Sequence, residues 1–252
     1  MIEVKVSDSE ATLHKSLALR GAQWRENLAQ YVRIIAAVAW KDLRSEVRGR
    51  EVFGLWFTFG LLILFVFSVT IDITTLPLEA VGPGFLWVAF ALVGTIGLNH
   101  SFSQERERGG WEALLMAPAD HSAIYLGKLL ANLAFTLTAQ AAILAGFTVF
   151  VRAPADPLGL LLATLLGTVG FLGVGTLLAA FVASAPAKQL LLPVMLLPVI
   201  VPVIALASQL TAVALVGASS DASALVVIFL VGYDAIAVLG GAAAFSFITE
   251  LY

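Results

Sequence analysis

Long segments without charge recur along this sequence and constrain its fold more than any other feature. Hydrophobic residues make up 60% of the 252 residues and charged residues 12%, against about 45–50% and about 25% in soluble domains. Such an excess of apolar surface cannot be hidden in one soluble core. Six segments approach or exceed the roughly 20 residues that a helix needs to cross a bilayer: residues 53–71, 83–102, 122–151, 158–182, 190–204 and 224–248. We therefore expect an all-α integral membrane protein.

Few residues in the chain are suited to catalysis or metal binding. There is no cysteine, and the three histidines, His14, His100 and His121, are widely spaced. Phosphate-binding glycine loops and nucleophile motifs are also absent. We expect a protein that is not an enzyme, with no covalently bound cofactor, no metal centre and no nucleic-acid partner. If energy is needed, another chain must supply it.

The basic residues lie almost entirely on one side of the predicted membrane, which fixes the expected orientation. Arg152 stands alone on one side, and thirteen lysines and arginines share the other. Because short basic loops stay in the cytoplasm, both termini and the 103–122 loop are predicted to be cytoplasmic. No signal-peptide h-region precedes the first span. Residues 1–30 are predicted to form an N-terminal cytoplasmic extension, and residues 31–252 the membrane domain.

A helix is predicted before the first span. Apolar residues recur at helical spacing from Trp24 to Ile35, and Lys41, Arg44 and Arg48 follow on one face at i, i+3 and i+7. An apolar face beside a basic face indicates a helix lying in the membrane surface, near anionic headgroups. The alternative is an ordinary solvated helix.

A polar loop at residues 103–122 separates the second and third spans. Within it, Trp111, Leu114 and Leu115 share one helical face. Gly109 and Gly110 loosen the backbone before this turn, and Pro118 ends it; Asp120 or Ser122 is placed to cap the third span. A short apolar-faced helix across the ends of two spans suits docking onto a soluble partner. The alternative is a solvated loop whose tryptophan anchors at the lipid interface.

The later spans differ in composition. The fourth is rich in glycine, which lets helices approach closely in lipid, so we expect it at the centre of the bundle. The fifth contains Pro193, Pro198 and Pro202, which predict a bent or broken helix that lines a path or gate, or a kinked packing helix. Residues 208–223 are interpreted as a polar interruption, with a short re-entrant piece at residues 210–216. Asp234 lies deep in the sixth span and is expected to face the bundle or a cavity.

Three ordered groups of residues resemble the CcmB family, the membrane subunit of the haem-exporter ABC transporter of cytochrome c maturation. The first runs from Lys41 to Arg48 and the third from Leu197 to Pro202. The second comprises Phe102, Glu105, Gly110-Trp-Glu112-Ala-Leu-Leu-Met-Ala-Pro118 and Ile124-Tyr-Leu-Gly-Lys128. The resemblance covers about residues 34–250.

The resemblance implies a six-span ABC-2 type exporter permease in the bacterial inner membrane. An interfacial elbow helix would occupy about residues 31–50, including Lys41, Asp42, Arg44 and Arg48. The segment implied as the coupling helix, at about residues 105–118, contains Glu105, Gly110, Trp111, Glu112, Leu114, Leu115 and Pro118. Pro193, Pro198, Pro202 and Asp234 would belong to a translocation path or gate.

The resemblance also implies partners and a cargo. A CcmA-type ATPase would bind ATP, and a second copy of this chain, CcmC, CcmD and the haem chaperone CcmE would complete the assembly. The cycle would export haem or release haem-loaded chaperone. His100 is a weak candidate haem ligand, and the simpler interpretation is an interfacial polar residue. Alternatives are an ABC-2 permease for a lipid, polysaccharide or drug, and a secondary transporter or scaffold without an ATPase.

Overall fold

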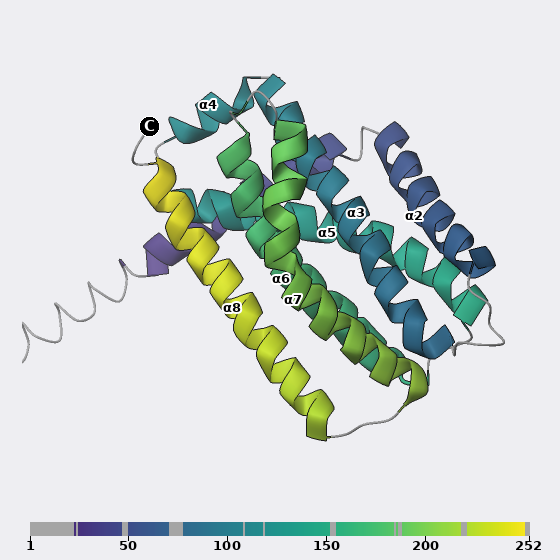
Figure 1. The fold of residues 1–252 in the computed structure, drawn as a ribbon. Coiled ribbons are helices and arrows are strands. Elements are labelled where there is room, and N and C mark those ends of the chain that lie inside the picture. The colour runs from purple at the N-terminus through teal and green to yellow at the C-terminus, as the bar shows by residue number, and fades with distance from the viewer. Residues whose placement is uncertain are drawn as a thin grey trace, which may run out of the picture.

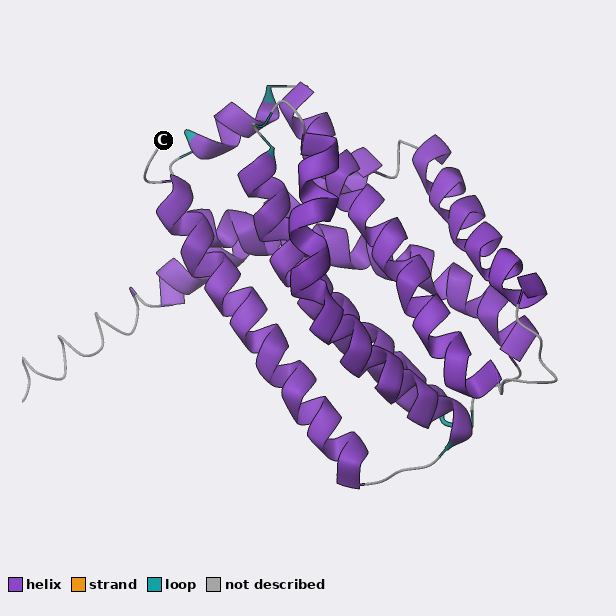
Figure 2. Cartoon of the chain, viewed as in Figure 1, coloured by secondary structure: helices purple, strands orange, loops and turns teal. Residues whose placement is uncertain are grey.

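A computed structural model describes most of the chain: residues 23, 25–46, 50–70, 78–107, 109–117, 119–151, 155–183, 185, 188–217 and 221–249. Residues 1–22 and 24 of the predicted 1–30 extension, Arg48 and Pro118 therefore lie outside the described residues. The described part of the chain is helical and contains no strand (Figure 2). The all-α prediction is confirmed.

The helices follow one another with short connections. An N-terminal helix covers residues 25–46. It is followed by α2 (Arg50–Thr70), α3 (Leu78–Glu107), α4 (Gly110–Leu115), α5 (His121–Val151), α6 (Pro157–Val182), α7 (Lys188–Val216) and α8 (Asp221–Thr249). Figure 1 shows the long helices side by side, with the short α4 lying across one end of the bundle.

Five helices of the described chain are long and apolar enough to cross a membrane: α3, α5, α6, α7 and α8. The first predicted span, residues 53–71, corresponds to α2, in which the described apolar stretch, Thr58–Phe67, is shorter than a full crossing. A multi-pass membrane protein is thus supported, while the six-span count stays a prediction.

The glycine-rich helix α6 lies at the centre of the bundle, as its composition predicted. It packs against α3, α5, α7 and α8. A side chain at Gly167 would overlap the Trp87 ring on α3, and one at Gly173 would lie 3.0 Å from Ala237 on α8. The glycines therefore permit the close helix approach that packing in lipid favours.

The predictions for the fifth span are partly wrong. α7 is one continuous helix that contains Pro193, Pro198 and Pro202, and Figure 1 shows it bending along its length. It is bent rather than broken, and no interruption begins at residue 208. The hydroxyls of Ser208 and Thr211 donate to the carbonyls of Ala205 and Ala207 (3.0 and 2.8 Å). Because the helix satisfies these polar groups, the re-entrant piece at 210–216 is also wrong.

The ends of α5, α6 and α7 are capped by local hydrogen bonds. Asp120 accepts from the backbone N–H of Ser122 (2.9 Å), so Asp120 caps α5. Asp156 caps α6 by accepting from the N–H of Gly159 (3.0 Å). The N–H groups of Ala155 and Asp156 also donate to the last carbonyls of α7, those of Leu215 and Ala214 (3.3 and 2.9 Å). The turn before α6 thus closes the α6–α7 hairpin.

Candidate functional site

The predicted docking segment forms a sharp corner followed by a single short helix. The corner follows the end of α3, where the Gly109 N–H donates to the Arg106 carbonyl (3.0 Å). Gly109 has a φ of 67°, a conformation that glycine adopts without steric cost, as it does at many helix ends. α4 then runs from Gly110 to Leu115 before the cap of α5.

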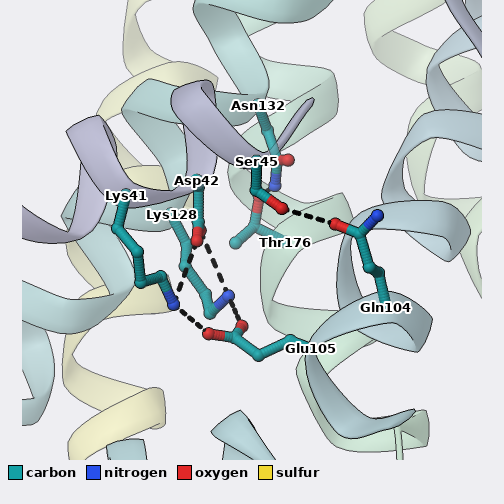
Figure 3. A network of polar contacts seen from close by, with 8 residues as sticks. All are labelled: Lys41, Asp42, Ser45, Gln104, Glu105, Lys128, Asn132 and Thr176. Atoms are coloured by element: carbon teal, nitrogen blue, oxygen red, sulfur yellow. Dashed lines mark hydrogen bonds and ion pairs between the residues drawn. The ribbon is translucent and has the colours of Figure 1, made fainter. Parts of the chain in front are cut away.

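Four charged side chains from three helices meet at the root of this segment (Figure 3). Lys41 and Asp42 come from the N-terminal helix, Glu105 from the last turn of α3 and Lys128 from the start of α5. The Glu105 carboxylate pairs with both lysines. The Asp42 carboxylate also contacts both, at 3.1 Å from Lys41 Nζ and 3.3 Å from Lys128 Nζ. Two cations and two carboxylates therefore balance one another.

The cluster is shielded from solvent mainly on its Lys128 side. The Lys128 side chain is 1% exposed, whereas that of Lys41 is 49% exposed. The Lys128 ammonium also lies 4.8 Å from the centre of the Phe102 ring, a favourable cation–π position. A buried charge without partners is costly, so the loss of one member would destabilise those that remain.

Further polar contacts hold the end of α3 against its neighbours. The Ser45 hydroxyl donates to the Gln104 side chain (2.7 Å), and His100 Nδ1 lies 3.1 Å from a Glu46 carboxylate oxygen. Both contacts join the N-terminal helix to α3. Arg106 donates to the carbonyl of Ala183, just after α6. A cavity of about 220 Å³ lies between the N-terminal helix, α3 and the start of α4, lined in part by Lys41, Glu46 and Glu105.

The residues predicted for the coupling helix occupy different positions in the structure. Glu105 belongs to α3 and faces the interior, not α4. Gly110 begins α4, and an added Cβ would lie 3.3 Å from Glu105 Cγ. Leu114 packs against the bundle core, whereas Met116 is 84% exposed. Trp111, Glu112 and Leu115 lie in α4, and their side chains, like Pro118, are outside the described set.

The residues predicted for the elbow helix also occupy different positions in the structure. Helical structure extends over residues 25–46, so it starts earlier than the 31–50 boundaries, and Arg50 belongs to α2. Arg44 is exposed. Lys41 and Asp42 instead join the cluster of four charges, which the sequence did not reveal. The contact of His100 with Glu46 favours the structural interpretation of that histidine.

A buried polar stripe along α5 was missed by the sequence analysis. Lys128, Asn132, Thr136 and Gln140 recur every four residues and are all buried. Asn132 donates to Thr176 on α6 (3.4 Å), and Gln140 accepts from Thr168 (2.8 Å). The spacing places the four residues on one helical face, and this regularity was the signal that could have revealed the stripe.

The predicted path residues do not converge. Pro198 and Pro202 are exposed on α7 and Pro193 is partly buried, whereas Asp234 is 7% exposed and faces α6. A hydrogen bond joins α7 and α8 where the Tyr233 hydroxyl donates to the Val199 carbonyl (3.1 Å). Within the described ranges, no group of three or more His, Asp or Glu residues could hold a metal ion.

Comparisons with known proteins identify the family of the chain. A family model described as CcmB protein matches residues 33–248. "Heme exporter protein B" of Rhodobacter capsulatus is 30% identical over 173 residues, which is 68% of this chain and 78% of the relative. The protein of the same name from Pseudomonas aeruginosa is 28% identical over 164 residues, 65% of this chain and 74% of the relative. The chain therefore belongs to the CcmB family.

Proposed function

We propose that this chain is the membrane permease subunit of an ABC-type haem exporter in which a separate subunit hydrolyses ATP. The names of the relatives support haem as the cargo, and the five long apolar helices support a membrane role. The observation that carries the mechanical part is the four-charge cluster at the root of α4. A docking helix can transmit force only if its root is fixed to the helices that must move.

The cluster gives α4 that connection. Glu105 lies five residues before α4 begins, and its carboxylate is held by Lys41 and Lys128. A displacement of α4 by an ATPase would therefore pull α3, α5 and the N-terminal helix together. We propose that the N-terminal helix acts as the elbow in this movement and that α2 is the first of six spans.

The docking face includes the exposed side of α4 and Met116 in the turn that follows it. Met116 and Ala113 are exposed, while Leu114 is turned towards the bundle. We propose that Met116, Trp111, Glu112 and Leu115 contact the ATPase and that Leu114 anchors α4 to its own chain. Apolar anchors buried in a partner's groove dominate such interfaces, and losing one can cost about 2 kcal/mol or more.

The wider assembly follows from the same proposal. The permease would lie in the bacterial inner membrane with both termini in the cytoplasm and would pair with a second copy of itself. A CcmA-type ATPase, CcmC, CcmD and CcmE would be its partners in exporting haem or releasing haem-loaded chaperone. The proline-bent α7 would serve as a gate. We assign no haem ligand to this chain.

Co-purification of the ATPase tests the docking role of α4. Met116→Asp and Leu115→Asp should insert into membranes at wild-type levels but recover much less ATPase, because each places an unpaired carboxylate in an apolar groove. Ala155→Asp is the matched control, since it adds the same charge to an exposed turn at the other end of α6. Undiminished recovery with both α4 variants would rule out α4 as the docking element.

Cytochrome c maturation measured in the same strains tests the haem assignment separately. The two α4 variants should abolish maturation, and the Ala155→Asp control should retain it. If docking is lost while maturation continues, the permease acts on a different cargo.

A further inference from the structure

Asp234 is a carboxylic acid in an unusual position. It lies at the middle of α8 and is 7% exposed. Its side chain faces Gly170, at the middle of α6, where an added Cβ would lie 2.5 Å from Asp234 Oδ1. Both of its carboxyl oxygens are buried and lack a hydrogen-bond partner among the described residues. A group buried in this way must be neutral or must bind something, because an isolated charge at this depth is very costly.

No described cation is placed to neutralise this carboxyl. α8 packs against α5, α6 and α7. α6 contains no ionisable residue, and α7 contains only Lys188, at its first position. α5 contributes His121, Tyr125 and Lys128; the Tyr125 hydroxyl donates to the carbonyls of Gly173 and Ala237, and Lys128 belongs to the charge cluster. On α8 itself, the neighbouring Tyr233 bonds to α7.

The space beside Asp234 suits a proton better than a metal cation. A bound metal cation would need several oxygen ligands at more than about 2 Å. The described chain offers no cluster of three acidic or histidine side chains, and the carboxyl already lies directly against the α6 backbone at Gly170. A proton needs neither extra ligands nor extra volume.

The face of α8 that carries Asp234 borders a cavity nearer the start of the helix. A cavity of about 690 Å³ opens between the ends of α6, α7 and α8 that lie opposite α4, and Val227, Leu210 and Gly159 help to line it. Val227 and Asp234 are two helical turns apart, about 10 Å along α8. Between them Leu230 is fully buried in a core cluster with Ala163 of α6 and Ala207 of α7. Leu230 thus lies between the cavity-lining Val227 and Asp234 on this face of α8.

We propose that Asp234 is a proton-binding site within the membrane and that its proton exchanges with the solution through this cavity, past Leu230. The carboxyl takes a proton from water when the Leu230 contact opens and returns it by the same route. This inference does not depend on the cargo or on the ATPase.

Chemical labelling of the complete protein in lipid nanodiscs tests the site. Dicyclohexylcarbodiimide, an apolar reagent that reacts with protonated carboxyls, should modify Asp234 near neutral pH, as measured by peptide mass spectrometry. Asp156, an exposed carboxylate that caps α6, is the internal control and should stay unmodified. The Asp234→Asn variant should lose the label. Equal labelling of the two acids, or none at Asp234, would overturn the proposal.

The route is tested with a water-soluble carbodiimide. Leu230→Ala should raise the labelling rate of Asp234 severalfold, because it opens the barrier between the cavity and the acid. Phe247→Ala, an exposed position far along α8, is the control and should leave the rate unchanged. An unchanged rate in Leu230→Ala would overturn the route. If Leu230→Ala fails to fold, the water-soluble carbodiimide is added to the wild-type protein in detergent-free vesicles. Labelling of Asp234 would then support the route, and no labelling would overturn it.

Discussion

Buried polar side chains are paired on one side of α6 and unpaired on the other. On the side facing α5, Asn132 pairs with Thr176 and Gln140 pairs with Thr168, and the stripe continues to Lys128 with its two carboxylate partners. On the side facing α8, the Asp234 carboxyl oxygens have no hydrogen-bond partner among the described residues. Both sides are buried and both lie along the same central helix.

The paired polar residues on the α5 side and the unpaired acid on the α8 side must serve different purposes. Paired polar side chains hold helices together in lipid, where the hydrophobic effect does not. An unpaired acid cannot serve that purpose and reduces stability, so its presence calls for another explanation. By this reasoning the paired side chains between α5 and α6 hold the two helices together, whereas Asp234 between α6 and α8 serves the proposed proton binding.

Removing Lys128 from the cluster of four charges should have the largest effect on stability. Lys128→Met leaves the buried Glu105 carboxylate and the partly buried Asp42 carboxylate with the half-exposed Lys41 as their remaining lysine partner. Removing one partner of a buried ion pair costs about 3–5 kcal/mol. The free energy of unfolding, measured by denaturant titration in mixed micelles, should fall by about this amount.

The matched control for this prediction is Lys41→Met. Its side chain is 49% exposed, and solvent-exposed ion pairs contribute about 0–1 kcal/mol. Equal losses for the two lysines would show that burial of Lys128 does not determine the strength of the cluster.

Removing the unpaired acid should have the opposite sign. Asp234→Leu replaces two unsatisfied oxygens with methyl groups of similar arrangement, so the protein should become more stable by about 1–3 kcal/mol. Thermal unfolding in nanodiscs measures the change, and Asp234→Asn, which keeps polar atoms in place, should gain less. A less stable Asp234→Leu protein would indicate that the acid has a partner and would remove the contrast between the two sides.

The smallest effect is expected among the paired side chains between α5 and α6. Thr176→Val removes the hydrogen bond from Asn132 (3.4 Å) while keeping the side-chain shape. Interhelical hydrogen bonds in membranes are worth about 0.6 kcal/mol on average. The double-mutant cycle with Asn132→Ala should report a coupling of about this size. A coupling near zero would mean that packing alone holds the two helices together here.

The long helices were predictable because a bilayer leaves few alternatives. The segments at 122–151 and 158–182 match His121–Val151 and Pro157–Val182 closely. α7 was misjudged at its end because Ser208 and Thr211 look like loop residues. Their hydroxyls bond within the helix, and Trp87 Nε1 donates to Thr211 (2.9 Å).

The candidate site was harder to predict than the helices. Glu105 was predicted to belong to the coupling helix, but its partners lie 64 and 23 residues away in the sequence. Charge pairing over such distances leaves no local pattern, since it depends on how helices are placed in space. The stripe along α5, by contrast, has a spacing of four that the sequence does display.

The hydrogen bonds that close the α6–α7 hairpin have a consequence for how the chain is made. The amides of Ala155 and Asp156 find their acceptors on Ala214 and Leu215, so those acceptors do not exist while α6 is leaving the ribosome. About 60 residues must follow, which at about 5–20 residues per second takes several seconds. The hydrogen bonds at the start of α6 therefore form only after the end of α7 has been synthesised.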